Sequence, residues 1–131
     1  MNREALFAKI HYARVTSCLP DYSGSITIDA DLLKATGIRP NEKVLVADTV
    51  TLNRFETYVF AGKKGSRCIE VNGAAASLTS IGNPVIIMSF CHLEDEEFNV
   101  HCPKIVICDA ENSIAEEFEY QSASELEKAI S

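Results

Sequence analysis

Apolar and polar residues alternate along most of the chain, and this pattern predicts a protein built mainly of β-strands with a few short helices. The first such segment, Ala5–Thr16, repeats with a period of two, which is typical of a strand with one buried face. Its expected buried face carries Leu6, Ala8, Ile10 and Tyr12. Lys9 and His11 fall on the opposite face, which is either a solvated surface or a place where two potentially cationic side chains meet an anion.

Six later segments also predict strands, and they are Ser25–Ile28, Lys43–Ala47, Arg54–Phe60, Arg67–Val71, Val85–Cys91 and Lys104–Cys108. Because Lys43–Ala47 and Val85–Cys91 are almost continuously apolar, we expect the first to be buried on both faces and the second to be the most buried strand of all. In the third segment, Arg54 and Tyr58 share one face and Thr57 lies on the other.

Two short helices interrupt the strands. Asp29 is a good N-cap for a helix over Ala30–Ala35, and Gly37 is a good stop for it. A second helical segment, Ser77–Ile81, stops at Gly82.

Turn-forming residues predict how the strands are joined. Gly62–Ser66 is typical of a hairpin-like turn, and Asn72–Gly73 of a tight turn followed by the small residues Ala74–Ala76, which leave the backbone open for close approach. Glu94–Glu97 predicts a solvated acidic turn. Residues 110–131 are acidic and predict either a loose terminal helix or a frayed tail after a last strand at 104–108.

A weak internal repeat relates the segments around Gly37 and Gly82, which lie 45 residues apart. Each has the order short helix, Gly, Pro-containing turn, apolar strand. The repeat favours a barrel of two interleaved halves related by a pseudo-two-fold axis, in which closure would protect the sheet edges.

Size and charge narrow the class of protein. A chain of 131 residues fits a single domain with a self-supporting core. Its net charge of −7 argues against nucleic acid or an anionic membrane as a general partner, so an anionic ligand needs a locally basic pocket. Met1–Glu4 is not followed by an apolar run long enough for a signal peptide, and we expect a cytoplasmic protein.

The cysteines and histidines predict neither disulfides nor a metal site. The five cysteines are odd in number and scattered, which suits a reducing compartment. Cys91–His92 and His101–Cys102 contain zinc-ligand residue types, but their spacing matches no ligand motif. Adjacent residues on a strand also point to opposite faces, so we expect no metal.

Tyr22–Ser25 carries the most distinctive candidate chemistry. A Gly-Ser pair between a loop and a strand is usually just a turn. A Ser hydroxyl held against the preceding carbonyl can, however, attack its own backbone, and Gly tolerates the strained geometry that this attack needs. The choice between these interpretations of Gly24–Ser25 depends on the rest of the chain.

Five scattered motifs, taken together in this order and spacing, closely resemble the pyruvoyl-dependent aspartate 1-decarboxylases. They are Lys9-Ile10-His11, Tyr22-Ser23-Gly24-Ser25, Arg54-Phe55-Glu56-Thr57-Tyr58, Gly65-Ser66-Arg67 and Val71-Asn72-Gly73-Ala74-Ala75-Ala76. The resemblance covers roughly the first 90 residues, and its specificity lies in the combination. It implies a single-domain double-psi β-barrel that assembles as a homotetramer with its sites between subunits and makes β-alanine from L-aspartate for pantothenate and coenzyme A synthesis.

The resemblance also implies a proenzyme that cuts itself between Gly24 and Ser25. The products would be a small chain, residues 1–24, and a large chain, residues 25–131, whose first residue is a covalent pyruvoyl group made from Ser25. That ketone would bind the substrate amine as a Schiff base and replace pyridoxal phosphate, with no metal. A maturation partner is a further possibility that the sequence leaves open.

Roles for the remaining residues follow from the same resemblance. Lys9 and Arg54 would bind the substrate carboxylates, assisted by Thr57 and by the backbone of Gly73, Ala74 and Ala75. Tyr58 would donate the proton, or it is merely an aromatic residue on a strand. His11, Tyr22 and Asn72 are supporting candidates; Asn72 would polarise the Gly24 carbonyl or simply shape its turn.

One departure from the family keeps the substrate open. Family members carry a large aromatic residue near Ala47, and the small side chain here leaves extra room. The alternatives are therefore a pyruvoyl decarboxylase of another small acidic amino acid, such as glutamate, or a non-catalytic barrel that serves as an interaction module.

Overall fold

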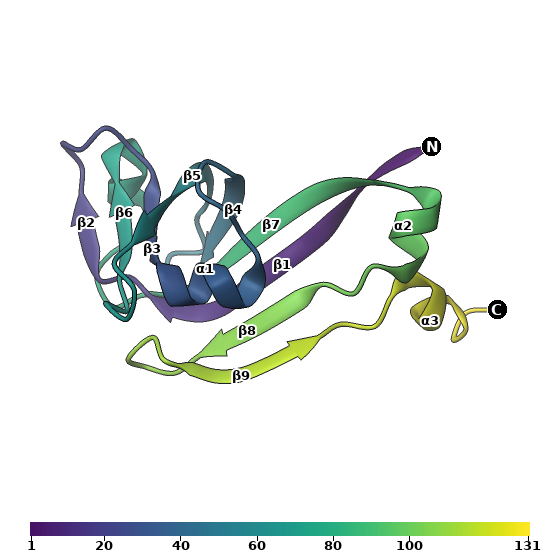
Figure 1. The fold of residues 1–131 in the computed structure, drawn as a ribbon. Helices are drawn as coiled ribbons and strands as arrows, with labels where there is room; N and C mark the ends of the chain where they lie inside the picture. The colour runs from purple at the N-terminus through teal and green to yellow at the C-terminus, as the bar shows by residue number, and fades with distance from the viewer.

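Nine strands, three short α-helices and one 3-10 helix make up the computed structural model, which describes all residues 1–131 (Figure 1). The strands are β1 (Asn2–Arg14), β2 (Ser17–Leu19), β3 (Ile26–Asp29), β4 (Lys43–Asp48), β5 (Arg54–Gly62), β6 (Ile69–Asn72), β7 (Pro84–Glu94), β8 (Lys104–Cys108) and β9 (Ile114–Glu119). The helices are α1 (Ala30–Thr36), η1 (Gly73–Leu78), α2 (Asp95–Val100) and α3 (Ala123–Glu127). None of them is long and apolar enough to cross a membrane.

All nine strands belong to one curled sheet with the order β2-β6-β3-β5-β4-β7-β1-β8-β9. Three pairs are parallel, namely β1–β8, β2–β6 and β3–β5. The predicted class, mainly β with short helices in a single domain, is confirmed. The architecture is consistent with a double-psi barrel, although the hydrogen-bonded sheet ends at β2 and β9 without closing.

The concave side of the sheet encloses one apolar core. Nineteen buried residues form a continuous cluster, in which Ile10, Ile26, Val46 and Ile87 are completely buried. Burial of such side chains is the main term that stabilises a fold of this size. The strands that carry the core therefore also fix the direction of the side chains on the outer face.

Helix α1 begins and ends where the sequence predicts. The Asp29 side chain accepts a hydrogen bond from the Asp31 backbone N–H at 2.8 Å, and Gly37 adopts a left-handed C-cap with φ of 80°. Leu32 and Leu33 turn into the core.

The predicted hairpin between β5 and β6 is wrong. Strand β3 lies between them, parallel to β5 and antiparallel to β6. The segment 62–66 therefore connects β5 and β6, which are not neighbours in the sheet. The edge of β5 that would pair with β6 in a hairpin is already hydrogen-bonded to β3.

The internal repeat has a structural counterpart, since β4 and β7, the strands that follow its two Pro-containing turns, pair antiparallel. Their predicted burial is only half correct. Each strand buries one face, which carries Val44 and Val46 in β4 and Val85 and Ile87 in β7, while the alternate residues are half-buried or exposed. The apolar residues of each strand therefore lie on two different surfaces, one packed in the core and one only partly buried.

Tyr12 does not lie on the buried face of β1, contrary to expectation. Its φ of 63° coincides with a register shift between His11 and Ala13, and its side chain is 44% exposed. The irregularity is a β-bulge, which returns Ala13 to the core and leaves Tyr12 outside.

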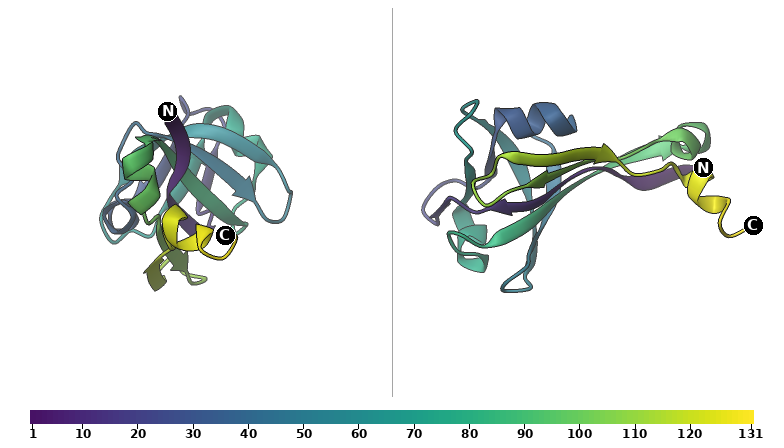
Figure 2. Two further views of the ribbon diagram at one scale, coloured as in Figure 1. Left: turned by 90° about the vertical axis from the view of Figure 1, so that its right-hand side faces the viewer. Right: turned by 90° about the horizontal axis from the view of Figure 1, so that it is seen from below.

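Three predictions in the second half of the chain are also corrected. The acidic segment at 94–97 contributes to helix α2 instead of forming a simple turn, and the helix predicted at 77–81 lies earlier, as η1. Residues 110–131 are not a loose tail, since they contain β9, paired antiparallel with β8, and α3. Strands β1 and β7 extend beyond the barrel toward α2, α3 and both termini (Figures 1 and 2).

Candidate active site

The Gly24–Ser25 bond lies at the entrance of β3 in a strained conformation. Gly24 has a φ of 113° and Ser25 a φ of 87°, in the left-handed region that a residue with a side chain rarely adopts. Ser25 is only 1% exposed, and its carbonyl accepts a hydrogen bond from the Asn72 backbone N–H at 3.0 Å. Neighbouring β6 therefore helps to hold the Ser in this conformation.

Gly73 packs directly against the same bond. A Cβ added to Gly73 would lie 2.7 Å from the Gly24 Cα and 2.9 Å from the Gly24 nitrogen, which is closer than atoms can approach. Its φ is 76°, so both space and backbone conformation require Gly at this position. The predicted close approach of backbone after Asn72 is thus present, and its partner is Gly24.

Tyr58 reaches this bond from β5. Its hydroxyl donates a long hydrogen bond, 3.5 Å, to the Ser23 carbonyl, and a Cβ added to Gly24 would lie 3.3 Å from the same hydroxyl oxygen. The ring packs edge-on against Phe60, with centroids 5.5 Å apart. A phenol hydroxyl is therefore within reach of the peptide group that would be cut.

Two buried polar atoms beside the bond have no hydrogen-bond partner: Ser25 Oγ and Asn72 Oδ1. Buried polar groups are normally paired, so orphaned atoms of this kind mark a place where chemistry or a ligand is expected. Both residues line a cavity of about 270 Å³. Its full lining is Leu19, Tyr22, Ser23, Gly24, Ser25, Thr27, Phe60, Glu70 and Asn72.

Two polar residues of this cavity were not anticipated from the sequence. Thr27 accepts a long hydrogen bond, 3.5 Å, from the Asn72 side chain, and Glu70 faces Thr27 across the β3–β6 pair. The sequence signal for these two residues is the period of two in a strand. Thr27 lies two residues after Ser25, and Glu70 lies two residues before Asn72, so each shares a face with a predicted site residue. Finding them required the β3–β6 register, which no local pattern provides.

The predicted cationic residues all lie on the outer face of the sheet. One row of paired residues across β5, β4, β7 and β1 consists of Arg54, Ala47, Ile86 and His11. The adjacent row consists of Glu56, Leu45, Met88 and Lys9. We call these two rows the cation face; with strands about 4.8 Å apart, Arg54 and His11 are separated by about 14 Å.

His11 is held in an apolar setting on this face. Burial and the neighbouring Lys9 charge both lower the pKa of its imidazole, so the neutral form is favoured. Its ring stacks on Tyr12, with centroids 4.0 Å apart, and its buried Nδ1 has no partner.

The predicted residues differ in whether they line the Gly24–Ser25 cavity. Tyr22 lines the Gly24–Ser25 cavity, whereas Lys9, His11 and Arg54 do not. Ala74 and Ala75 follow Gly73 in η1, and Thr57 is half-buried on the face of β5 opposite Tyr58. One chain therefore brings together the bond, Tyr58, Asn72 and Gly73, and places the cations elsewhere.

A buried carboxylate fixes the segment that carries Gly73. Asp48 is 2% exposed and accepts hydrogen bonds from the Thr79 hydroxyl at 2.6 Å and the Asn83 amide at 2.9 Å, just beyond η1. Burial raises the pKa of Asp48, but these bonds and those from the Thr51 and Val50 backbone outweigh burial and leave the pKa below its ordinary value.

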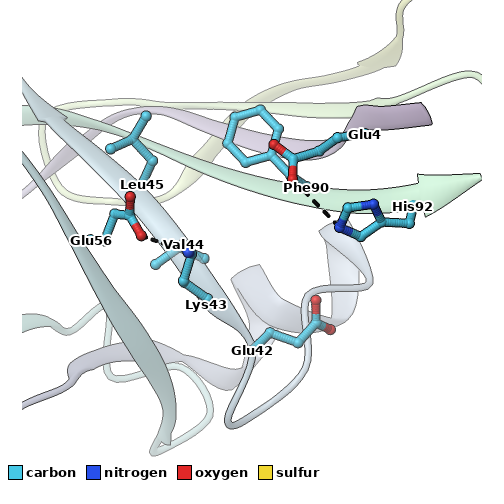
Figure 3. A pocket seen from close by; sticks show the side chains of 8 residues that line it. All are labelled: Glu4, Glu42, Lys43, Val44, Leu45, Glu56, Phe90 and His92. Atoms are coloured by element: carbon cyan, nitrogen blue, oxygen red, sulfur yellow. Dashed lines mark ion pairs between the residues drawn. The ribbon is translucent and has the colours of Figure 1, made fainter. Parts of the chain in front are cut away.

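A larger cavity, of about 460 Å³, lies on the outer face beside the cation face, with which it shares Leu45 and Glu56 (Figure 3). Three carboxylates line it, those of Glu4, Glu42 and Glu56, and Lys43 is paired with Glu56 at 2.7 Å. Like charges repel, so this cavity disfavours a dianionic ligand despite its size. Size alone therefore does not locate the site.

The described chain contains no group of three or more His, Cys, Asp or Glu side chains that could hold a metal ion. All five cysteines are free, and Cys108 is buried, which raises the pKa of its thiol to about 11.

The barrel thus holds a buried Gly-Ser bond in which Ser25 has a strained backbone conformation and a hydroxyl without a hydrogen-bond partner. The model of the family described as "Aspartate decarboxylase" matches residues 1–115. The chain is 48% identical over 116 residues to "Aspartate 1-decarboxylase" of Staphylococcus aureus strains JH9 and Newman, covering 88% of this chain and 91% of each relative. The chain belongs to the aspartate decarboxylase family, which confirms the resemblance.

Proposed function

We propose that this protein decarboxylates L-aspartate at the α-carboxylate to give β-alanine and CO2, and so supplies β-alanine for pantothenate and coenzyme A synthesis in the cytoplasm. Family membership supports the reaction. The observation that carries the mechanism is the Gly24–Ser25 bond, which is strained, buried and flanked by an unpaired Ser hydroxyl.

Ser25 starts maturation. Its Oγ attacks the Gly24 carbonyl carbon, the Gly24–Ser25 C–N bond breaks, and an ester replaces the amide. β-Elimination releases the Gly24 carboxylate and leaves dehydroalanine at position 25, and water then converts that residue to a pyruvoyl group with loss of ammonia. The unpaired Ser25 Oγ and the strained backbone conformation of Ser25 favour the first step.

The pyruvoyl group, once formed, supplies an electron sink for the electrons released when the α-carboxylate leaves. The chain's own residues do the rest. Tyr58 donates the proton of its phenol hydroxyl to the α-carbon. Asn72 lines the cavity beside the reacting position, and Gly73 packs against Gly24. The backbone of Gly73 and of Ala74 and Ala75, which follow it in η1, helps to hold the substrate.

Arg54 and Lys9, supported by the neutral His11, bind the substrate carboxylates on the cation face. Thr57 lies on the other face of β5 and is not part of the cation face. A net charge of −7 makes such local cations necessary for a dianion. Because one chain separates this face from the Gly24–Ser25 bond, we propose that the cation face of one subunit meets the bond of another in a homotetramer. Arg54→Ala should then cost roughly 2–5 kcal/mol in kcat/KM if its ion pair with the substrate is desolvated.

Intact-mass measurement and a CO2 assay test the proposal together. Purified wild-type protein should contain the two fragments 1–24 and 25–131 and release CO2 from L-aspartate. Ser25→Ala should stay whole and inactive, because it has no Oγ, while the matched control Ser23→Ala should be cut normally. Two fragments in Ser25→Ala would contradict the mechanism, and a whole, inactive wild-type chain would favour a non-catalytic interaction module.

A second candidate substrate, glutamate, has one observation in its favour. Ala47 stands between Arg54 and Ile86 in the cation face, so a small side chain occupies the centre of a row that would contact the substrate. Comparing kcat/KM for aspartate and glutamate in the wild type and in Ala47→Trp separates the two. If the wild type prefers glutamate and Ala47→Trp loses this preference, glutamate and not aspartate is the substrate.

A further inference from the structure

Tyr120, just after β9, contacts the ammonium group of Lys9. Lys9 Nζ donates a hydrogen bond to the Tyr120 hydroxyl at 2.7 Å and lies 5.1 Å from the centre of its ring. The Tyr120 backbone N–H donates to the Pro103 carbonyl at 2.9 Å, which fixes the residue beside the start of β8. Tyr120 lies beyond residues 1–115, the part of the chain that the family model matches.

The surroundings of Lys9 are acidic, yet Lys9 makes no ion pair. The nearby strand β9 carries Glu116, Glu117 and Glu119, but no ion pair within the chain includes Lys9. Glu117 and Glu119 alternate with Phe118 and Tyr120 along the strand and therefore point to its other side. Glu116 shares the side of Phe118, but it lies in the row of His11, through Ile107, and makes no ion pair with Lys9. The position that faces Lys9 is filled by a neutral side chain.

A neutral acceptor has a specific consequence for the charge of Lys9. An ammonium group has three N–H donors, and Tyr120 accepts only one of them. The aromatic ring attracts the cation without cancelling its charge, whereas a carboxylate in the same position would cancel it. Tyr120 thus restricts a flexible four-carbon side chain and leaves two donors and the full charge for another anion.

We propose that Tyr120 is a positioning residue that holds Lys9 ready for a substrate carboxylate. The role rests on the proposed function, because it requires Lys9 to bind substrate. Tyr120 itself touches no reacting atom and acts through Lys9. The β8–β9 hairpin and the segment after it are therefore part of the substrate-binding apparatus.

A double-mutant cycle on the full, matured protein tests this role. Tyr120→Phe keeps the ring and removes the hydroxyl, so KM for L-aspartate should rise about 3- to 10-fold with kcat nearly unchanged. Lys9→Ala should raise KM further. Adding Tyr120→Phe to Lys9→Ala should then change nothing, because the group through which Tyr120 acts is gone.

Two outcomes separate this inference from the proposed function. An unchanged or lowered KM in Tyr120→Phe, beside a raised KM in Lys9→Ala, would overturn only the role of Tyr120, as would an equal effect of Tyr120→Phe in both backgrounds. A wild-type KM in Lys9→Ala would overturn the assignment of Lys9 to substrate binding, and with it the role of Tyr120.

A second measurement detects the contact without turnover. In protein labelled with carbon-13 at the lysine ε-carbon, the Lys9 signal is identified by its loss in Lys9→Ala. It should move in Tyr120→Phe and lose its ring-induced shift in Tyr120→Leu. It should stay in place in Ile114→Val, a matched change at the other end of β9. A Lys9 signal that ignores both Tyr120 substitutions would contradict the proposal.

Discussion

At the scale of single residues, the site is organised by backbone conformations that side chains normally avoid. Ser25 has a positive φ without being Gly, and Gly73 has one where a side chain would also collide with Gly24. A positive φ costs a residue other than Gly about 1–3 kcal/mol and persists only when the surroundings impose it. At Ser25 the β3–β6 pairing imposes it, since the Asn72 backbone N–H donates to the Ser25 carbonyl.

Gly73→Ala should therefore do more harm than a positive φ alone explains. We expect a loss of about 1–3 kcal/mol or more in stability and failure to cut the 24–25 bond, because the new Cβ displaces Gly24. Gly65→Ala is the matched control: its φ is 78°, against 76° for Gly73, but no atom lies within 4 Å of its added Cβ. Thermal unfolding and intact mass report both effects. Equal losses in the two variants would refute the collision.

Tyr58→Phe should mature but turn over slowly. The hydroxyl that contacts the Ser23 carbonyl is the proposed proton donor, and loss of a general acid typically lowers kcat about 100-fold or more. Single-turnover kinetics on fully cut protein isolate the chemical step, and Tyr12→Phe, a hydroxyl deletion on β1, serves as control. A wild-type kcat in Tyr58→Phe would remove Tyr58 from the acid role.

At the scale of elements, the β4–β5 connection controls where η1 lies. Asp48 binds Thr79 and Asn83 beyond η1, and the Asn53 side chain donates to the Leu78 carbonyl at 3.0 Å. Charge-assisted hydrogen bonds of this kind are roughly twice as strong as neutral ones. The position of Gly73 against Gly24 thus depends on a carboxylate at the end of a different strand.

Asp48 should make stability depend on pH in the acid range. A carboxyl whose pKa is lowered by folding contributes stability above its unfolded pKa and loses it as pH falls through the folded value. The melting temperature of the wild type should therefore fall below about pH 4 more steeply than that of Asp48→Asn. Asp48→Asn should also be less stable at neutral pH by about 1–3 kcal/mol. The exposed Asp21→Asn is the control, and identical pH profiles for Asp48→Asn and wild type would contradict this account.

At the scale of the whole molecule, the separation of the cation face from the bond predicts complementation between subunits. Arg54→Ala and Ser25→Ala chains should each be nearly inactive alone. Co-expressed at equal levels, they should recover up to about a quarter of wild-type activity, because half of the faces and half of the bonds are intact and pair at random. Activity no higher than that of the separate variants would place each site within one chain.

The sequence predicted local features well and long-range ones poorly. Alternation correctly placed Arg54 and Tyr58 on the face of β5 opposite Thr57, and local signals located Asp29 and Gly37 at the ends of α1. The separation of β5 from β6 was missed because β3 pairs with both over a long range. Strand β9 was missed because all six of its residues are exposed, so it has no apolar period to detect.

The residues of the candidate site also divide into those that local motifs reveal and those that only long-range pairing brings together. Gly24, Ser25, Tyr58 and Gly73 were found as short motifs, and the structure brings them together. Thr27, Glu70 and Tyr120 were not found, because their relevance depends on the β3–β6 register and on the β8–β9 hairpin. Apart from the period of two at Thr27 and Glu70, no spacing in the sequence encodes these contacts.

The central place of β1 in the sheet has a consequence for refolding. This strand is hydrogen-bonded to β7 on one side and β8 on the other, and it belongs to residues 1–24. Once the bond is cut, that fragment is not a releasable peptide but an internal strand contributed by a second molecule. An uncut chain would refold in a unimolecular reaction, whereas a denatured protein cut as proposed would have to re-form in a bimolecular one whose rate depends on concentration. The proposed maturation would thus convert a chain that refolds alone into a pair whose recovery from denaturation weakens on dilution.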